Sequence, residues 1–138
     1  MAGYSATPLV KKLGFKEGFR VGFVNPPRGF QKELALLPSD VSISVGTMTK
    51  PLDLIILFAD SQKALKKEFS VLAQKLSENG MLWVAWPKKS SGVRSGLSDN
   101  NVRDIGLDAG LVDVKVCAVN DVWSGLKFVY RLQDRKAR

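Results

Sequence analysis

Two uninterrupted apolar segments constrain the fold of this chain more than any other feature of its sequence. Leu52 to Ala59 is apolar except at Asp53, and Met81 to Trp86 is apolar throughout. Short segments that do not alternate with polar positions are typical of strands buried on both faces of a parallel sheet. We therefore expect these two segments to form the centre of a sheet that helices cover on both sides.

A helix is predicted between the two apolar segments. Asp60 and Ser61 precede it, with Asp60 as its expected cap, and Asn79-Gly80 marks its expected end. The apolar stripe of this helix has helical spacing and consists of Leu65, Phe69, Leu72 and Leu76. A strand–helix–strand unit of this kind joins two parallel strands.

The rest of the chain extends the same pattern on both sides. Before the first apolar segment we expect a helix from Thr7-Pro8 to Gly14, a strand over Phe19 to Asn25, a helix from Phe30 to Pro38 and an edge strand over Val41 to Val45. After the second apolar segment we expect a helix from Ser98 or Asp99 to Gly110. Two strands follow, over Leu111 to Val119 and Leu126 to Leu132, joined by a hairpin turn at Trp123-Ser124-Gly125. The tail from Gln133 to Arg138 is expected to fray.

These elements predict one α/β domain over residues 1–138. The expected architecture is three-layered and Rossmann-like, with a mostly parallel sheet of about six strands and a C-terminal antiparallel hairpin. With the strand order 2-1-3-4, the order reverses between the first and third strands, and ligands of open α/β sheets bind at that point, past the carboxyl ends of the strands.

The residue inventory excludes several kinds of chemistry. The chain has no histidine and one cysteine, Cys117, so a zinc site of the usual type, a Ser-His or Cys-His nucleophilic pair and an internal disulfide are all excluded within it. Its net charge of +8 favours anionic partners, with solubility alone as the other interpretation. Without an apolar run long enough for a membrane span or a signal core, we expect a cytoplasmic protein.

Two resemblances follow from these patterns. Residues 52 to 132 resemble the C-terminal half of a class I methyltransferase, with residues 18 to 45 as a shortened first half. Nearly the whole chain is also similar to an uncharacterised bacterial family, domain of unknown function 3052. The residues that carry this similarity include Gly3-Tyr4-Ser5, Lys11-Lys12-Leu13-Gly14, Trp86-Pro87-Lys88-Lys89-Ser90, Gly110-Leu111-Val112-Asp113 and Trp123-Ser124-Gly125-Leu126. The family implies no assigned activity, substrate or cofactor.

The loop Asn25-Pro26-Pro27-Arg28-Gly29 occupies the place of the cofactor loop in a methyltransferase. Such a loop depends on glycines, which let the backbone approach the ligand, whereas the two prolines here remove two backbone donors. Asn25-Pro26-Pro27 also resembles part of the Asn-Pro-Pro-aromatic motif of amino-methyltransferases, but that motif follows a later strand. These features disfavour S-adenosylmethionine-dependent methylation.

A second loop, Trp86-Pro87-Lys88-Lys89-Ser90-Ser91-Gly92, follows the second apolar segment. Two ammonium groups, two hydroxyls and free backbone N–H groups suit a bound anion such as phosphate, although the sequence is not a P-loop. We expect this loop and residues 25–28 to be the two sides of one crevice, with Trp86 as a wall on which a base stacks and Arg103 nearby. A solvated surface turn is the alternative.

The remaining candidates have structural explanations. Asp113 and Lys115 are expected to pair with each other or to form a polar outer face. Trp83 is expected in the core, and Asp53 in solvent. Cys117 lacks a histidine partner and is expected to be an inert, partly buried thiol.

Together these observations predict a non-enzymatic binding module without a catalytic residue, cofactor or metal. Its expected ligand is an anionic small molecule, a nucleotide or a protein partner, and not a membrane. The candidate binding residues are Asn25, Arg28, Trp86, Lys88, Lys89, Ser90, Ser91 and Arg103. Non-specific binding of nucleic acid or of an acidic surface is the alternative, and S-adenosylmethionine-dependent methylation the least favoured function.

Overall fold

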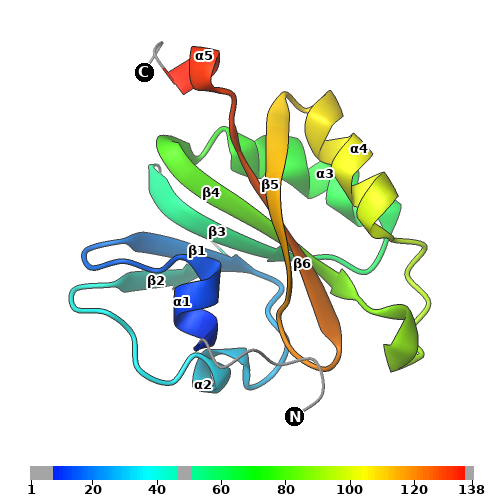
Figure 1. Cartoon of the computed structure of the whole chain (residues 1–138), viewed down its shortest axis with the longest axis horizontal. Coiled ribbons are helices and arrows are strands. Elements are labelled where there is room, and N and C mark those ends of the chain that lie inside the picture. Colours follow the sequence, from blue (N-terminus) through cyan, green and yellow to red (C-terminus); the bar gives the residue numbers. More distant parts are fainter. Residues whose placement is uncertain (1–7, 47–50, 136–138) are drawn as a thin grey trace.

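A single six-stranded sheet organises the chain (Figure 1). The computed structural model describes residues 8–46 and 51–135. The strands lie in the order β2-β1-β3-β4-β6-β5, and β1 to β4 pair in parallel, while β6 is antiparallel to both β4 and β5. Their bounds are β1 Arg20–Val24, β2 Ser42–Val45, β3 Leu52–Phe58, β4 Leu76–Pro87, β5 Leu111–Ala118 and β6 Trp123–Tyr130. The predicted mostly parallel sheet with an antiparallel hairpin is confirmed.

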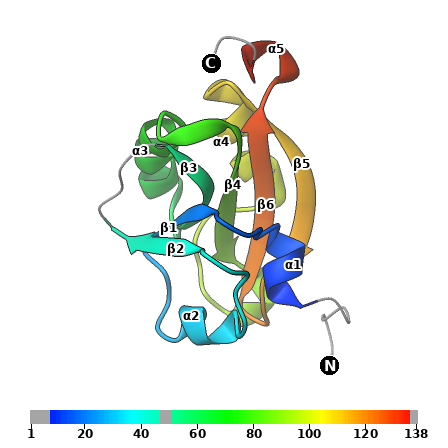
Figure 2. The same ribbon diagram turned by 90° about the vertical axis from the view of Figure 1, so that its left-hand side faces the viewer.

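Helices cover both faces of the sheet, as the two-sided burial of β3 requires. Figures 1 and 2 show α3 and α4 together on one face, and α1 and α2 on the other. The helix bounds are α1 Leu9–Leu13, α2 Phe30–Glu33, α3 Gln62–Ala73, α4 Asp99–Asp108 and α5 Leu132–Arg135, with a 3-10 turn, η1, over Lys89–Ser91. No helix in the described ranges has the length and apolarity needed to cross a membrane.

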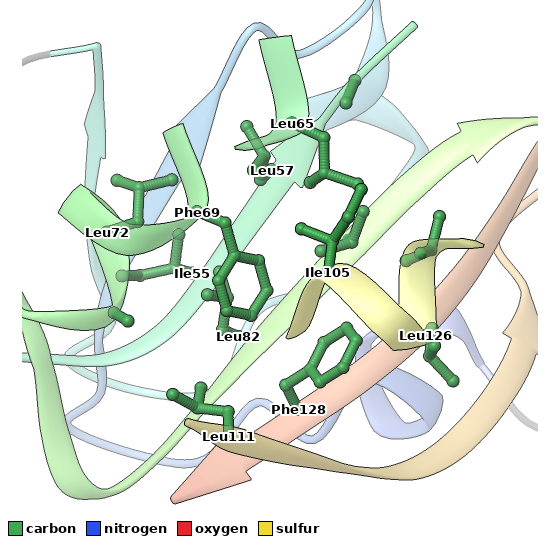
Figure 3. Close-up of a cluster of buried hydrophobic side chains, with 14 of the residues drawn as sticks. Ile55, Leu57, Leu65, Phe69, Leu72, Leu82, Ile105, Leu111, Leu126 and Phe128 are labelled. Atoms are coloured by element: carbon green, nitrogen blue, oxygen red, sulfur yellow. The ribbon is translucent and has the colours of Figure 1, made fainter. Parts of the chain in front are cut away.

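The core on the α3 and α4 face is built from the predicted helical stripe. Leu65, Phe69 and Leu72 are buried against β3, β4 and β6 (Figure 3). The ring of Phe69 meets that of Phe128 edge to face, with 5.1 Å between centroids. Gly106 of α4 lies directly over the same ring, because a Cβ atom there would sit 2.0 Å from Cε1 of Phe128. This contact lets α4 approach the sheet closely.

The core on the other face is aromatic and includes one buried polar anchor. Phe23, Phe30, Phe58 and Trp123 form a chain of edge-to-face contacts, with 5.3, 4.8 and 5.1 Å between successive centroids. Trp83 is buried as expected, and its indole N–H donates to the Leu13 carbonyl at 2.8 Å. This hydrogen bond attaches the C-terminus of α1 to the centre of the sheet.

The predicted end of the central helix and start of the next strand are wrong. Helix α3 ends at Ala73, and Leu76 is not part of its stripe but the first residue of β4, paired with Leu52. Asn79-Gly80 therefore lies within β4. A Cβ atom on Gly80 would lie 3.0 Å from the Leu52 carbonyl oxygen, so glycine allows the chain to pass β3 where the register shifts.

Other predicted boundaries also change. Helix α2 ends at Glu33 instead of continuing to Pro38, and Ala35 adopts a left-handed φ of 57°. Trp123-Ser124-Gly125 belongs to β6, so the hairpin turn lies at residues 120–122. The tail that was expected to fray begins with the short helix α5. The cap predicted at Thr7 lies outside the described residues.

Strand β5 does not alternate regularly along its length. Its register with β6 shifts between Asp113 and Lys115, which changes the face that each later side chain occupies. Val114 and Val116 are consequently more than half exposed on this edge strand.

The contact between Gly106 and Phe128 generates a test of the packing. Gly106→Ala would ordinarily stabilise a helix by about 1 kcal/mol. Here the added methyl group overlaps a buried ring, and overpacking costs about 1–3 kcal/mol, so we expect a net loss in the free energy of unfolding measured by urea denaturation. Adding Phe128→Leu should make the alanine less destabilising than it is alone; equal losses in both backgrounds would contradict this packing.

Candidate functional site

The strand order reverses between β1 and β3, as the sequence predicted for an order of 2-1-3-4. Both strands point the same way, so their carboxyl ends meet at one edge of the sheet. Asn25 follows β1 there, exposed and in a left-handed conformation with φ 55°. Asp60 follows β3, exposed, and Ser61 caps α3 by accepting the Ala64 N–H at 3.1 Å. The cap is thus Ser61 instead of Asp60, which leaves the Asp60 carboxylate at the point where the strand order reverses.

Two glycines border open space at this edge. Gly29 precedes α2 with φ 82°, and Gly46 follows β2 with φ 84°. A Cβ atom built on either glycine would meet no atom of residues 8–46 and 51–135 within 4 Å. The backbone at the ends of β1 and β2 is therefore accessible to a ligand. Pro26 and Pro27, which precede Gly29, are half-buried, and Arg28 is exposed.

The loop after β4 contributes a separate pair of hollows. One has a volume of about 270 Å³ and is lined by Trp86, Lys88, Lys89, Leu97, Ser98, Asp99, Val116 and Ser124. The other has a volume of about 510 Å³ and is lined by residues 92–98 together with Pro87 and Lys89, so that Arg94 contributes to it. Trp86 is only 5% exposed and packs in the core beneath α4, so little of its ring is available for stacking on a base.

Local hydrogen bonds hold the Lys88-Lys89 loop in place. The Lys88 N–H donates to the Val122 carbonyl at 2.7 Å, which attaches the loop to the β5–β6 turn. Ser91 turns back on the loop, because its hydroxyl donates to the Lys88 carbonyl at 2.6 Å. Lys89 and Ser90 are exposed. Anion binding by the ammonium groups of Lys88 and Lys89 stays a prediction.

Arg103 lies apart from that loop. Its Nε donates to Asp113 of β5 at 2.9 Å, and its Nη1 donates to Asn100 at 3.2 Å. The hydrogen bond that Arg103 donates to the Asp113 carboxylate is the largest of the effects that raise the pKa of Arg103. Asp113 therefore pairs with Arg103 across α4 and β5, not with Lys115 as expected.

The two predicted sides of the crevice are not adjacent. Strand β3 lies between β1 and β4, so Asn25 and Arg28 are separated from the Lys88-Lys89 loop by the end of β3. The loop after β1 also leads to α2 on one face, whereas Trp86 packs under α4 on the other. Sequence reasoning placed both loops at this edge of the sheet, but it assigned Asp60 to a helix cap and did not single out Gly29 or Gly46.

Two other residues have structural roles that the sequence did not suggest. Asp53 is half-buried at the opposite edge, where it accepts the Arg20 N–H at 2.8 Å and aligns the starts of β1 and β3. Asn120 organises the β5–β6 turn by accepting the N–H groups of Val122 and Trp123, each at 2.9 Å. Its amide also donates to Glu33 of α2 at 2.8 Å.

The comparisons with known proteins extend to structure only. No family profile and no curated protein sequence matches the chain, so its similarity to domain of unknown function 3052 stays a prediction. Among solved structures, an S-adenosylmethionine-dependent methyltransferase from Aquifex aeolicus matches with a TM-score of 0.60, 17% identity and coverage of 87% of this chain and 86% of the other. A TehB-like S-adenosylmethionine-dependent methyltransferase from Corynebacterium glutamicum matches with a TM-score of 0.58, 8% identity and coverage of 94% and 91%.

A third similar structure is longer than this chain. The protein from Bordetella parapertussis, described as a possible exported protein, matches with a TM-score of 0.65 and 10% identity. This chain is covered over 88% of its length but spans only 65% of that protein. At these identities the likeness concerns the fold.

The structural matches correct the expected function. The sequence predicted a non-enzymatic binding module because the glycine loop was replaced by prolines. That expectation is contradicted by the solved S-adenosylmethionine-dependent methyltransferases, which share the architecture over most of both chains. The chain has a methyltransferase-like, Rossmann-like α/β fold.

The anion-binding loop after β4 remains a prediction that thermal stability can test. We expect pyrophosphate to raise the unfolding temperature of the wild-type protein and to have little effect on Lys88→Ala/Lys89→Ala, because binding to the native state stabilises it. Lys63→Ala/Lys67→Ala on α3 is the matched control with the same loss of charge. Equal stabilisation of all three proteins would remove the loop as an anion site.

The thiol of Cys117 provides a second test through its pKa. Burial raises the pKa of Cys117, while Lys12, Lys115 and Lys127 lower it by a smaller amount. The reactive thiolate should therefore form at higher pH in the folded protein than in urea, as measured by the pH dependence of alkylation. Lys12→Gln should move this midpoint higher still, whereas a midpoint equal to that of the unfolded chain would contradict the burial effect.

Proposed function

We propose that this chain is an S-adenosylmethionine-dependent methyltransferase whose cofactor lies across the carboxyl ends of β1, β2 and β3. The observation that supports it is the sheet itself: parallel strands in the order β2-β1-β3-β4, closed by an antiparallel β6-β5 pair, in an architecture that matches solved methyltransferases. Ligands of open α/β sheets bind at the point where the strand order reverses.

The residues at that edge fit the polar groups of this cofactor. The open space beside Gly29 and Gly46 lets the ligand approach the backbone closely, a role that glycines perform in other nucleotide-binding loops. Asp60 would accept hydrogen bonds from ribose hydroxyls or from the amino group, and the Asn25 amide would both donate and accept. Pro26 and Pro27 supply no N–H groups, so side chains carry a larger share of the binding than in a glycine loop.

The acceptor would lie beyond the cofactor, over the end of β4. The bound cofactor supplies an activated methyl group, and this chain positions the acceptor. The hollows behind the Lys88-Lys89 loop are at the end of β4, and Ser124 of β6 and Val116 of β5 contribute to the smaller one. Lys88 and Lys89 would hold an anionic group of the acceptor there. The chain has no histidine, so Asp60 or solvent would take any proton that the acceptor loses.

Calorimetric titration with S-adenosylmethionine and S-adenosylhomocysteine tests this proposal. We expect saturable binding that Asp60→Asn weakens by roughly tenfold or more, because hydrogen bonds to a charged group contribute about 1.5–3 kcal/mol. Asp40→Asn is the matched control, since Asp40 precedes β2 at the opposite edge of the sheet.

The same titration can overturn the proposal. Absence of heat and of thermal stabilisation at millimolar concentrations of both compounds would exclude a cofactor site of useful affinity. Binding that Asp60→Asn and Asp40→Asn weaken equally would place the cofactor elsewhere on the chain.

A further inference from the structure

Four lysines gather on the α1 face of the β5–β6 hairpin. We call them the basic cluster: Lys12 of α1, Lys16 after α1, Lys115 of β5 and Lys127 of β6. Lys115 and Lys127 are directly opposite each other in the antiparallel pair. The Lys12 ammonium donates to the Ala118 carbonyl at 3.0 Å, which holds α1 against the end of β5 (Figures 1 and 2). Three elements thus bring positive charge to one surface.

The lysines of the basic cluster lack ion pairs with the carboxylates that the structure describes. None of its lysines forms an ion pair within residues 8–46 and 51–135, where the salt bridge found is that of Arg103 with Asp113. Partial burial lowers the pKa of Lys127, and repulsion from Lys115 and Lys16 lowers it further. Like charges directly opposite in a sheet destabilise it. The fold therefore keeps positive charges together on this surface although their repulsion lowers its stability. Such a charge distribution is typical of surfaces that attract an oppositely charged partner.

The positions of the four lysines favour a ligand that extends along this surface. The basic cluster lines neither of the hollows past β4, which are formed by other residues. Lys115 lies midway along an edge strand, whereas Lys12 contacts the last residue of β5 at the carboxyl edge. The charges are thus spread from the middle of the hairpin toward that edge. A small anion would contact only part of this surface, whereas a polymer could contact all of it.

We propose that the basic cluster binds the phosphate backbone of a nucleic acid. A polynucleotide has one negative charge per nucleotide, so ammonium groups spread over a surface can be neutralised together without a match to particular positions. An acidic protein would have to present carboxylates at four matching places. The net charge of +8 adds long-range attraction to the same partner. This surface is distinct from the proposed cofactor site and does not depend on it.

Fluorescence anisotropy with labelled oligonucleotides, single-stranded and duplex, tests this proposal between 50 and 200 mM salt. We expect binding that weakens steeply with salt and that Lys115→Gln/Lys127→Gln reduces at least tenfold at the lower concentration. Loss of two phosphate contacts should reduce the slope of log affinity against log salt by about 1.4 to 1.8. Lys12→Gln/Lys16→Gln should have a similar effect.

Lys63→Gln/Lys67→Gln is the matched control, because it removes the same charge from α3 on the other face of the sheet. Equal weakening by the control and the cluster variants would show that net charge alone acts, and would overturn the proposal. Undetectable binding at 50 mM salt would do the same. Polyglutamate that binds as tightly as the oligonucleotides through the same lysines would assign the surface to acidic proteins instead.

Two further measurements on the cluster variants distinguish loss of oligonucleotide binding from unfolding and from loss of cofactor binding. Removing repulsion between Lys115 and Lys127 should leave the unfolding temperature of Lys115→Gln/Lys127→Gln unchanged or higher, so loss of binding cannot come from unfolding. Titration of the same variant with S-adenosylmethionine reports on the other site independently. Loss of oligonucleotide binding with an unchanged cofactor titration would support the basic cluster as a separate site.

Discussion

The pairing of β3 with β4, buried on both faces, is the constraint on which the rest of the structure depends. Neither strand has a polar face to offer to solvent along its central residues, so helices must cover the sheet on both sides. Trp83 shows how closely this covering is coupled to the strands, since its indole N–H holds α1 by a buried hydrogen bond. On the other face, Gly106 brings α4 down onto the ring of Phe128. The parallel direction of β1, β3 and β4 then places their loops at a single edge.

The edge at the carboxyl ends of β1, β3 and β4 resembles that of a methyltransferase in its strand order. It differs from an enzyme with a glycine-rich cofactor loop in the residues that follow β1. The strand order reverses beside Asn25 and Asp60, where the left-handed Gly29 and Gly46 leave the backbone open. The prolines after β1 remove donors but do not close this space. The loss of two donors at Pro26 and Pro27 therefore does not exclude a ligand at this edge, because a loop sequence does not show which neighbouring backbone stays accessible.

Charge is distributed over the two faces in different ways. Arg103 is neutralised by Asp113 and joins α4 to β5, so it serves the fold. The basic cluster on the opposite face has no such partner in the described part of the chain, and its lysines repel one another. The composition alone could not distinguish these cases, since both contribute equally to a net charge of +8.

The sequence by itself determined the class of fold, the two buried strands, the stripe of α3 and the edge at which the loops lie, because burial and helical spacing are local patterns. It did not determine where elements end: Leu76 continues the helical spacing, yet pairing with Leu52 makes it part of β4. It also could not show that Asp113 pairs with Arg103 or that Lys115 faces Lys127. Those relations depend on strand order and on the register shift in β5, which arise only when distant segments pack together.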